Sequence, residues 1–206
     1  MDEECLFGGD QKFVNQVGLA PWLSEKATQH KATHGRETMK PNSKPVHPEV
    51  RIGHIHLKVA GLDRALAFYR GVLGFELTQR YGDQAAFLSA GGYHHHIGLN
   101  TWESQGGSPP HRGATGLYHV AIVYPTRAEL ADALRRLIQA SIRLEGASDH
   151  GVSEALYLRD PDGNGVELYW DRPQKQWPRT PDGRLNMGTG PLDLEALLKE
   201  APEPGL

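Results

Sequence analysis

Hydrophobic and polar residues alternate in short runs over the middle of the chain, and two of these runs match. The segments 54–59 (His-Ile-His-Leu-Lys-Val) and 119–124 (His-Val-Ala-Ile-Val-Tyr) both begin with histidine, and apolar residues recur at every second position. This period predicts a β-strand with one face against a core. The matching starts of the two segments indicate an internal repeat.

Each of these strands is followed by a helix pattern. Residues 63–73 form the first, which is closed by Gly74. Residues 126–140 form the second, and Thr126 and Glu129 have the spacing of a capping box, in which side chains satisfy free amides of the first turn. The strand–helix unit therefore occurs twice.

Short apolar runs after each helix predict three more strands in each half. They cover residues 75–79, 85–89 and 95–99, and then 142–144, 154–158 and 165–170. Each half is βαβββ, so the predicted fold class is α+β with paired βαβββ modules. We assign the modules to residues 51–102 and 116–172 of one domain, 51–172, joined by a Gly- and Pro-rich linker at 103–115.

The two ends of the chain lack a sustained helix or strand period. Residues 1–50 are polar and mixed and end in several prolines, so we interpret them as a flexible extension in which Met39 could be the natural start. Residues 173–206 are a second extension, also rich in proline, with a short helix expected at 192–201.

Composition narrows the class of protein. The 206 residues are 38% hydrophobic with a mean hydropathy of -0.52, which fits one core and predicts no membrane span. Cys5 is the single cysteine, so no internal disulfide can form, and no leader pattern is expected, which favours the cytoplasm. A net charge of -3 with dispersed basic residues argues against nucleic acid and favours a small-molecule partner.

Side-chain alternation places several metal-binding residue types away from the core. In the first strand His54 and His56 oppose the apolar row, in the second half His119 does, and in the last strand Glu167 does. An isolated histidine on a strand is usually a surface or hydrogen-bonded side chain. Two imidazoles and one carboxylate meeting in a cavity would form the facial triad that suits Fe(II).

Three motifs resemble the vicinal oxygen chelate superfamily, which includes glyoxalases and type I extradiol dioxygenases. They are LDRALAFYRGVLGF from residue 62, DPDGNGVEL from residue 160, and the order His150, Tyr157, Asp-Pro-Asp-Gly, Glu167. The last is similar to the signature of catechol 2,3-dioxygenase-like ring-cleaving enzymes. The resemblance implies a curved mixed sheet around a metal cavity. Many extradiol enzymes have four modules, whereas this repeat accounts for two.

The same resemblance implies roles for individual residues. His54, His119 and Glu167 would bind the metal, with His56 as the rival of His54. His96, in the run Tyr93-His-His-His, would be the acid–base residue, unless this run is only a solvent-facing or adventitious metal-binding one. His150 and Tyr157 would border the pocket and hydrogen-bond the diol.

The expected function is therefore Fe(II)-dependent extradiol cleavage of a catechol-like aromatic diol by O₂. Mn(II) would suit the same ligands. Two alternatives remain: a glyoxalase-like lyase or thiol transferase using another metal, and a metal-free protein that binds a drug or aromatic compound. Exposed sheet edges make a homodimer reasonable.

Overall fold

The computed structural model describes residues 44–111 and 113–203. Most of the extension predicted at 1–50, including Met39, lies outside this part of the chain, as do Cys5 and residues 204–206. Within the described part, no helix combines the length and hydrophobicity needed to cross a membrane.

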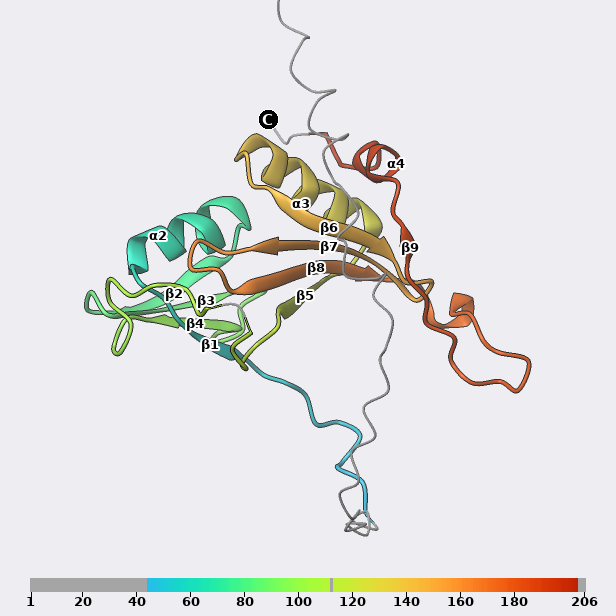
Figure 1. Cartoon of the computed structure of the whole chain (residues 1–206), viewed down its shortest axis with the longest axis horizontal. Coiled ribbons are helices and arrows are strands. Elements are labelled where there is room, and N and C mark those ends of the chain that lie inside the picture. The colour runs from blue at the N-terminus through green and yellow to red at the C-terminus, as the bar shows by residue number, and fades with distance from the viewer. Residues whose placement is uncertain (1–43, 112, 204–206) are drawn as a thin grey trace, which may run out of the picture.

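Each half contains one strand, a helical segment and three further strands (Figure 1). The elements of the first half are β1 (Ile55–Lys58), α2 (Leu62–Leu66), the π-helical turn η2 (Ala67–Val72), β2 (Glu76–Tyr81), β3 (Ala85–Ser89) and β4 (Ile97–Asn100). Those of the second are β5 (Val120–Tyr124), α3 (Arg127–Gln139), β6 (Leu144–Asp149), β7 (Ser153–Arg159) and β8 (Gly165–Asp171). The 3₁₀ turn η3 (Gln174–Gln176), the short strand β9 (Gly190–Pro191) and α4 (Leu194–Leu198) follow.

The strands form two mixed sheets, of order β1-β4-β3-β2 and β5-β8-β7-β6-β9. In each sheet the first strand of the module runs parallel to the last, with Leu57 opposite Leu99 and Ile122 opposite Leu168. The other neighbours are antiparallel. The predicted α+β class with a repeated βαβββ unit is confirmed.

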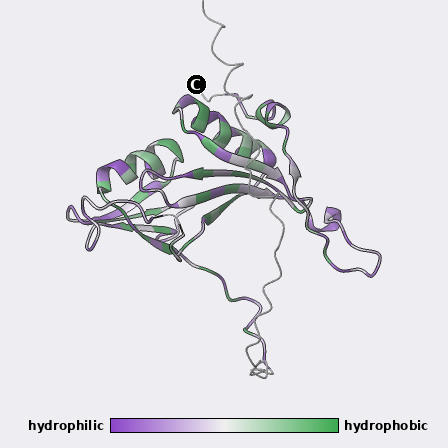
Figure 2. Ribbon diagram, viewed as in Figure 1, coloured by the Kyte–Doolittle hydropathy of each residue, from purple (hydrophilic) through white to green (hydrophobic). Residues whose placement is uncertain are grey.

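The core lies between the sheets and the helices that cover them. Figure 1 shows α2 and α3 on the same side of the two sheets, with α4 beside α3. Leu57 and Val59 of the first strand segment are buried while His54, His56 and Lys58 are exposed, as the alternation predicted. Helices and strands alternate between hydrophobic and hydrophilic residues, and the long loop after η3 is mainly hydrophilic (Figure 2).

One of the two hydrogen bonds of the predicted capping box is present at the start of the second helix. The Thr126 side chain accepts a hydrogen bond of 3.1 Å from the Glu129 amide at the start of α3. Buried residues on one face of α3, among them Leu130, Leu134 and Leu137, then pack into the core.

Several boundaries differ from the sequence predictions. β6 was expected at 142–144 but begins at Leu144 and runs to Asp149, with an irregularity between Leu144 and Gly146 that interrupts the two-residue period. β4 begins at Ile97, so the histidine run precedes the strand. The helix expected at 192–201 spans only Leu194–Leu198. β9 was not predicted, because its two residues become a strand only by pairing with β6.

The turn between β7 and β8 joins the two halves. This turn is the Asp-Pro-Asp-Gly segment, residues 160–163. In the structure Asp160 accepts a 3.0 Å hydrogen bond from the Tyr69 hydroxyl. Asp162 Oδ1 accepts from the Ala60 amide at 2.8 Å and from Arg64 at 2.5 Å. The turn therefore links the second module to α2, to η2 and to the segment between β1 and α2 of the first.

Candidate functional site

Parallel pairing of β5 with β8 brings His119 and Glu167 together. Ala121 lies opposite Glu167 in this register, and His119 precedes β5 on the same face as Ala121. His119 Nε2 is 2.9 Å from Glu167 Oε2, and both side chains are partly shielded, with 31% and 14% of their surface exposed. Gly165 permits this approach, because a Cβ there would lie 2.0 Å from the Tyr118 carbonyl oxygen.

The His119–Glu167 pair fits a metal ion by its donor types and spacing. Imidazole nitrogen and carboxylate oxygen are ligands of Fe, Mn and Zn. Two donors in neighbouring positions, each about 2.1 Å from one ion, lie about 3 Å apart, which matches the 2.9 Å separation. His119 Nδ1 is buried and has no hydrogen-bond partner within the described residues. The donor atoms that could hold a cation here are His119 Nε2 and Glu167 Oε2.

Tyr157 extends the site on the neighbouring strand. It lies directly opposite Glu167 in the antiparallel pairing of β7 with β8. Its hydroxyl donates to Glu167 Oε1 at 3.0 Å and lies 2.7 Å from His150 Nε2. Burial and then the Glu167 charge raise the pKa of Tyr157 well above its usual range. The raised pKa extends the pH range in which Tyr157 is a neutral hydroxyl, able to donate or accept a hydrogen bond.

His54, the third predicted metal ligand, does not join the His119–Glu167 pair. It is exposed before β1, and its ring centroid is 4.3 Å from that of His95. In residues 44–111 and 113–203 no three His, Cys, Asp or Glu side chains converge in a way that could hold a metal ion. The structure thus brings together His119 and Glu167 but not His54, and the ligand role of His54 stays a prediction.

His56, the rival of His54, faces aromatic side chains. Its ring lies 5.5 Å from Trp102 and 5.9 Å from Phe87. Burial and then the neighbouring His54 lower the pKa of His56. These contacts give His56 an aromatic environment, and the choice between the two histidines stays open.

His96 is held at the start of β4 by hydrogen bonds. Its amide donates to Leu88 O at 2.8 Å, and its Nδ1 lies 3.1 Å from the Ser89 hydroxyl. Tyr93 packs against the ring at 4.8 Å. Ser89 was not singled out from the sequence, where a lone serine on a strand carries no signal. The acid–base role of His96 stays a prediction.

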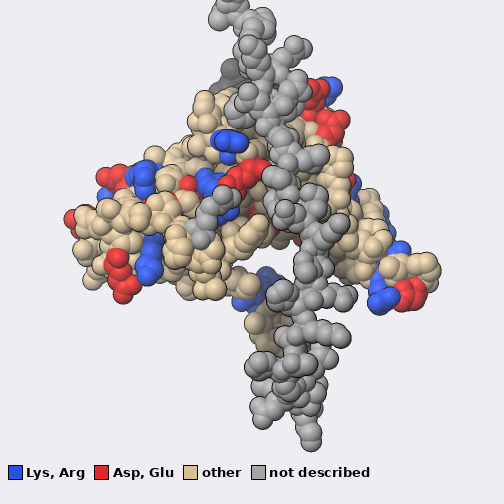
Figure 3. Space-filling model, in the orientation of Figure 1, with Lys and Arg blue, Asp and Glu red and all other residues tan. Residues whose placement is uncertain are grey.

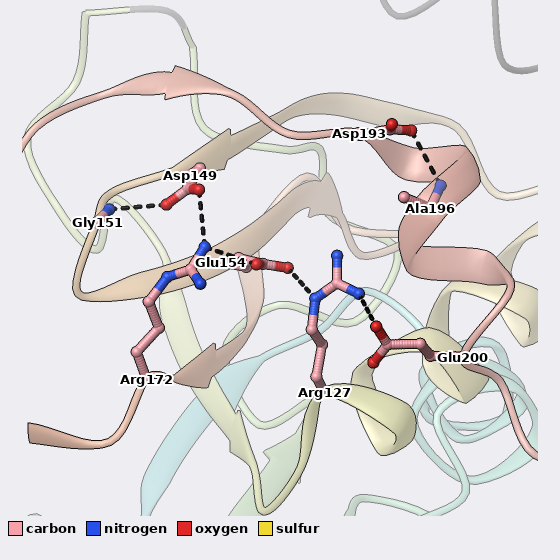
Figure 4. A network of polar contacts seen from close by, with 8 residues as sticks. All are labelled: Arg127, Asp149, Gly151, Glu154, Arg172, Asp193, Ala196 and Glu200. Atoms are coloured by element: carbon pink, nitrogen blue, oxygen red, sulfur yellow. Dashed lines mark hydrogen bonds and ion pairs between the residues drawn. The ribbon is translucent and has the colours of Figure 1, made fainter. Parts of the chain in front are cut away.

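A network of ion pairs supports the loop that carries His150 (Figure 4). Glu154 is buried and accepts from Arg127 and from Arg172, each at 2.7 Å. Arg172 also contacts Asp149 at 2.7 Å, and Arg127 contacts Glu200 beyond α4. Sequence reasoning missed this network because its partners are up to 73 residues apart.

A sequence profile described as the Glyoxalase/Bleomycin resistance protein/Dioxygenase superfamily matches residues 51–168. The chain belongs to this superfamily. It is 45% identical over 157 residues to the Catechol-2,3-dioxygenase of Bacillus subtilis (strain 168), covering 76% of this chain and 54% of that protein. It is 36% identical over 124 residues to Biphenyl-2,3-diol 1,2-dioxygenase 3 of Rhodococcus globerulus, covering 59% of this chain and 63% of that protein.

The chain spans between about half and two thirds of the length of these relatives. Among solved structures, the glyoxylase/bleomycin resistance protein/dioxygenase domain from Frankia sp. EAN1pec is similar, with a TM-score of 0.51 and 23% identity. The match covers 60% of this chain and 98% of the Frankia chain, and it concerns the fold alone.

Proposed function

We propose that this protein is an extradiol dioxygenase, which opens a catechol-like aromatic ring beside its two hydroxyl groups and places both atoms of O₂ in the product. The observation that carries the proposal is the continuous contact from His119 through Glu167 and Tyr157 to His150. The similarity to two ring-cleaving dioxygenases supports it.

Fe(II) is the proposed cofactor, with His119 and Glu167 as ligands and His54 as the third. Bound iron would supply the one-electron chemistry that lets dioxygen react with the diol. Mn(II) suits the same nitrogen and oxygen donors. Because the His119 Nε2–Glu167 Oε2 separation already fits two neighbouring ligand positions, little rearrangement of these side chains is required.

The remaining residues would orient the diol and move its protons. Tyr157 would hydrogen-bond a diol oxygen through its hydroxyl, and His150 would hold the Tyr157 hydroxyl in place. We assign to His96 Nε2 the removal of a proton from the diol, followed by return of that proton to the oxygen released during ring opening. Ser89, at 3.1 Å from Nδ1, would fix the ring.

Two further parts of the proposal concern assembly and location. β1 and β5 each lie at the edge of a sheet, and edge strands of this kind would support a homodimer. The cytoplasm is the proposed compartment, in keeping with a single cysteine that has no partner in the chain. Acidic and basic side chains are interspersed on the face in Figure 3, as expected for a protein that does not use a basic surface to bind nucleic acid.

The test is anaerobic loading with Fe(II), followed by oxygen-uptake and absorbance assays with a panel of catechols. We expect uptake of one O₂ per diol and a yellow ring-opened product. Isomerisation of a thiol–aldehyde adduct without oxygen uptake would instead establish lyase chemistry. Tight binding of aromatic compounds with no metal and no turnover would support a sequestering protein.

A further inference from the structure

The chain that follows β8 returns to the candidate site and contacts His150. β9 pairs with the end of β6, with Gly190 opposite Asp149 and Pro191 opposite Ser148. Just before β9, the Gly188 amide donates to His150 O at 3.2 Å, and Gly188 O lies 2.9 Å from His150 Nδ1. One residue therefore contacts both the backbone and the side chain of His150.

The contact at Nδ1 decides where the imidazole carries its hydrogen. A carbonyl oxygen can only accept, so His150 Nδ1 must be the donor in this 2.9 Å hydrogen bond. In a neutral ring Nε2 then has a free electron pair, and this is the nitrogen that lies 2.7 Å from the Tyr157 hydroxyl. The Tyr157 hydrogen is accordingly shared between His150 Nε2 and Glu167 Oε1.

A chain of polar contacts also connects the loop of His150 to Glu200 in the C-terminal segment. Asp149 accepts from the Gly151 amide at 2.8 Å and from Arg172 at 2.7 Å, so it braces both sides of His150. Figure 4 shows the network continuing through Glu154 and Arg127 to Glu200, just after α4. Leu197 of α4 is fully buried in the core and anchors this end.

We propose that the C-terminal segment, residues 173–203, is a positioning element of the site that holds His150 as the Nδ1–H tautomer, with Gly188 as the positioning residue. The consequence for turnover rests on the proposed function, because it concerns how Tyr157 meets the diol. The tautomer itself is a property of the chain without metal or substrate. The two can therefore be tested separately.

Gly188 allows a matched pair of variants. Its backbone lies outside the left-handed region, and a Cβ there would meet no atom within 4 Å, so Gly188→Ala keeps the amide donor and fits. Gly188→Pro removes the amide that donates to His150 O and restricts the conformation of the preceding residue, so we expect the carbonyl of residue 188 to move away from His150 Nδ1. The first variant is the control for the second.

The measurement is a long-range ¹H–¹⁵N spectrum of metal-free protein with ¹⁵N-labelled histidine, recorded at about pH 8.5, above the usual histidine pKa of about 6.5. Loss of a signal in His150→Gln assigns His150. We expect the Nδ1–H tautomer in the wild type and in Gly188→Ala, and a mixture of tautomers in Gly188→Pro. In iron-loaded enzyme, loss of a hydrogen bond worth about 1 kcal/mol predicts a kcat about fivefold lower for Gly188→Pro.

An Nε2–H tautomer or a mixture in the wild type would overturn the inference, even if Gly188→Pro fails to fold. An unchanged spectrum in a folded Gly188→Pro would overturn the role of Gly188. A pure Nδ1–H tautomer in a protein that cleaves no diol would support this inference while removing the proposed function. Ring cleavage by a wild-type protein with mixed His150 tautomers would support the proposed function and overturn this inference.

Discussion

Tyr69 is fully buried, and its hydroxyl donates to Asp160 across the junction of the modules. Burial and then the charge of Asp160 raise the pKa of Tyr69 far above its usual range. In the unfolded chain the hydroxyl loses its proton near pH 10, whereas in the fold it keeps it. Stability from Tyr69 is thus fully present below about pH 10 and is lost as the pH rises further toward the folded pKa.

Tyr69→Phe should therefore change the pH dependence of stability. At pH 8 we expect a loss of about 1 kcal/mol, since Asp160 keeps its three other donors. Above about pH 10 the wild type should lose stability faster than Tyr69→Phe, by up to about 1.4 kcal/mol per pH unit. The difference in the free energy of unfolding between the two proteins should therefore narrow. Urea unfolding from pH 8 to 11.5 measures it. A gap that is constant over this range would contradict the account.

His96 provides a test of proton transfer. His96→Phe should leave metal binding intact and lower kcat on the order of a hundredfold, because the proposed base is lost. His94→Phe, the same change two residues earlier on an exposed side chain, is the control and should retain activity. Metal content and steady-state kinetics are measured together. Equal kcat in His96→Phe and wild type would remove the role of His96.

The residue types of the site could be predicted from the sequence, because alternation assigns each side chain to a face and the motif orders His150, Tyr157 and Glu167. Their partners could not. Gly188 O, Ser89 and Asp149 act through contacts made by tertiary folding, and no local pattern marks them. The separation of His54 from the His119–Glu167 pair also lies beyond what a strand period can specify.

At the scale of elements, the ends of strands were harder to predict than their existence. β1, β5, β7 and β8 follow from alternation and apolar runs. β6 does not, because its sequence Leu-Glu-Gly-Ala-Ser-Asp has no two-residue period and contains an irregularity near Gly146. Its pairing with β7 and β9 defines it instead.

The ion-pair network that ties α4 to β7 should be important for stability. Glu154→Gln leaves Arg127 and Arg172 without their shared buried carboxylate, and we expect a loss of about 3 kcal/mol. Glu145→Gln is the control, because its pair with Arg159 is about half exposed and should contribute less than about 1 kcal/mol. Urea unfolding measures the free energy of unfolding of both variants. Equal losses in Glu154→Gln and Glu145→Gln would show that the buried network stabilises the protein no more than an ordinary surface ion pair.

At the scale of the whole molecule, Asp162 links the modules. Asp162→Ala leaves the Ala60 amide without its acceptor and should destabilise the protein by about 2 kcal/mol. Arg64→Ala removes only the half-exposed ion pair and should cost less than about 1 kcal/mol. Urea unfolding and hydrogen exchange at the Ala60 amide measure both. Unchanged exchange in Asp162→Ala would contradict the linking role.

The central claim concerns the reaction of the whole protein, and isotope labelling tests it most directly. Iron-loaded wild-type protein is given ¹⁸O₂ and a catechol that serves as its substrate. The ring-opened product is trapped quickly and its mass is measured by mass spectrometry. The variants His119→Ala and Glu167→Gln are treated in the same way. We predict two labelled oxygen atoms per product molecule in the wild type and loss of product in both variants. Product without label, or undiminished product in either variant, would contradict the account.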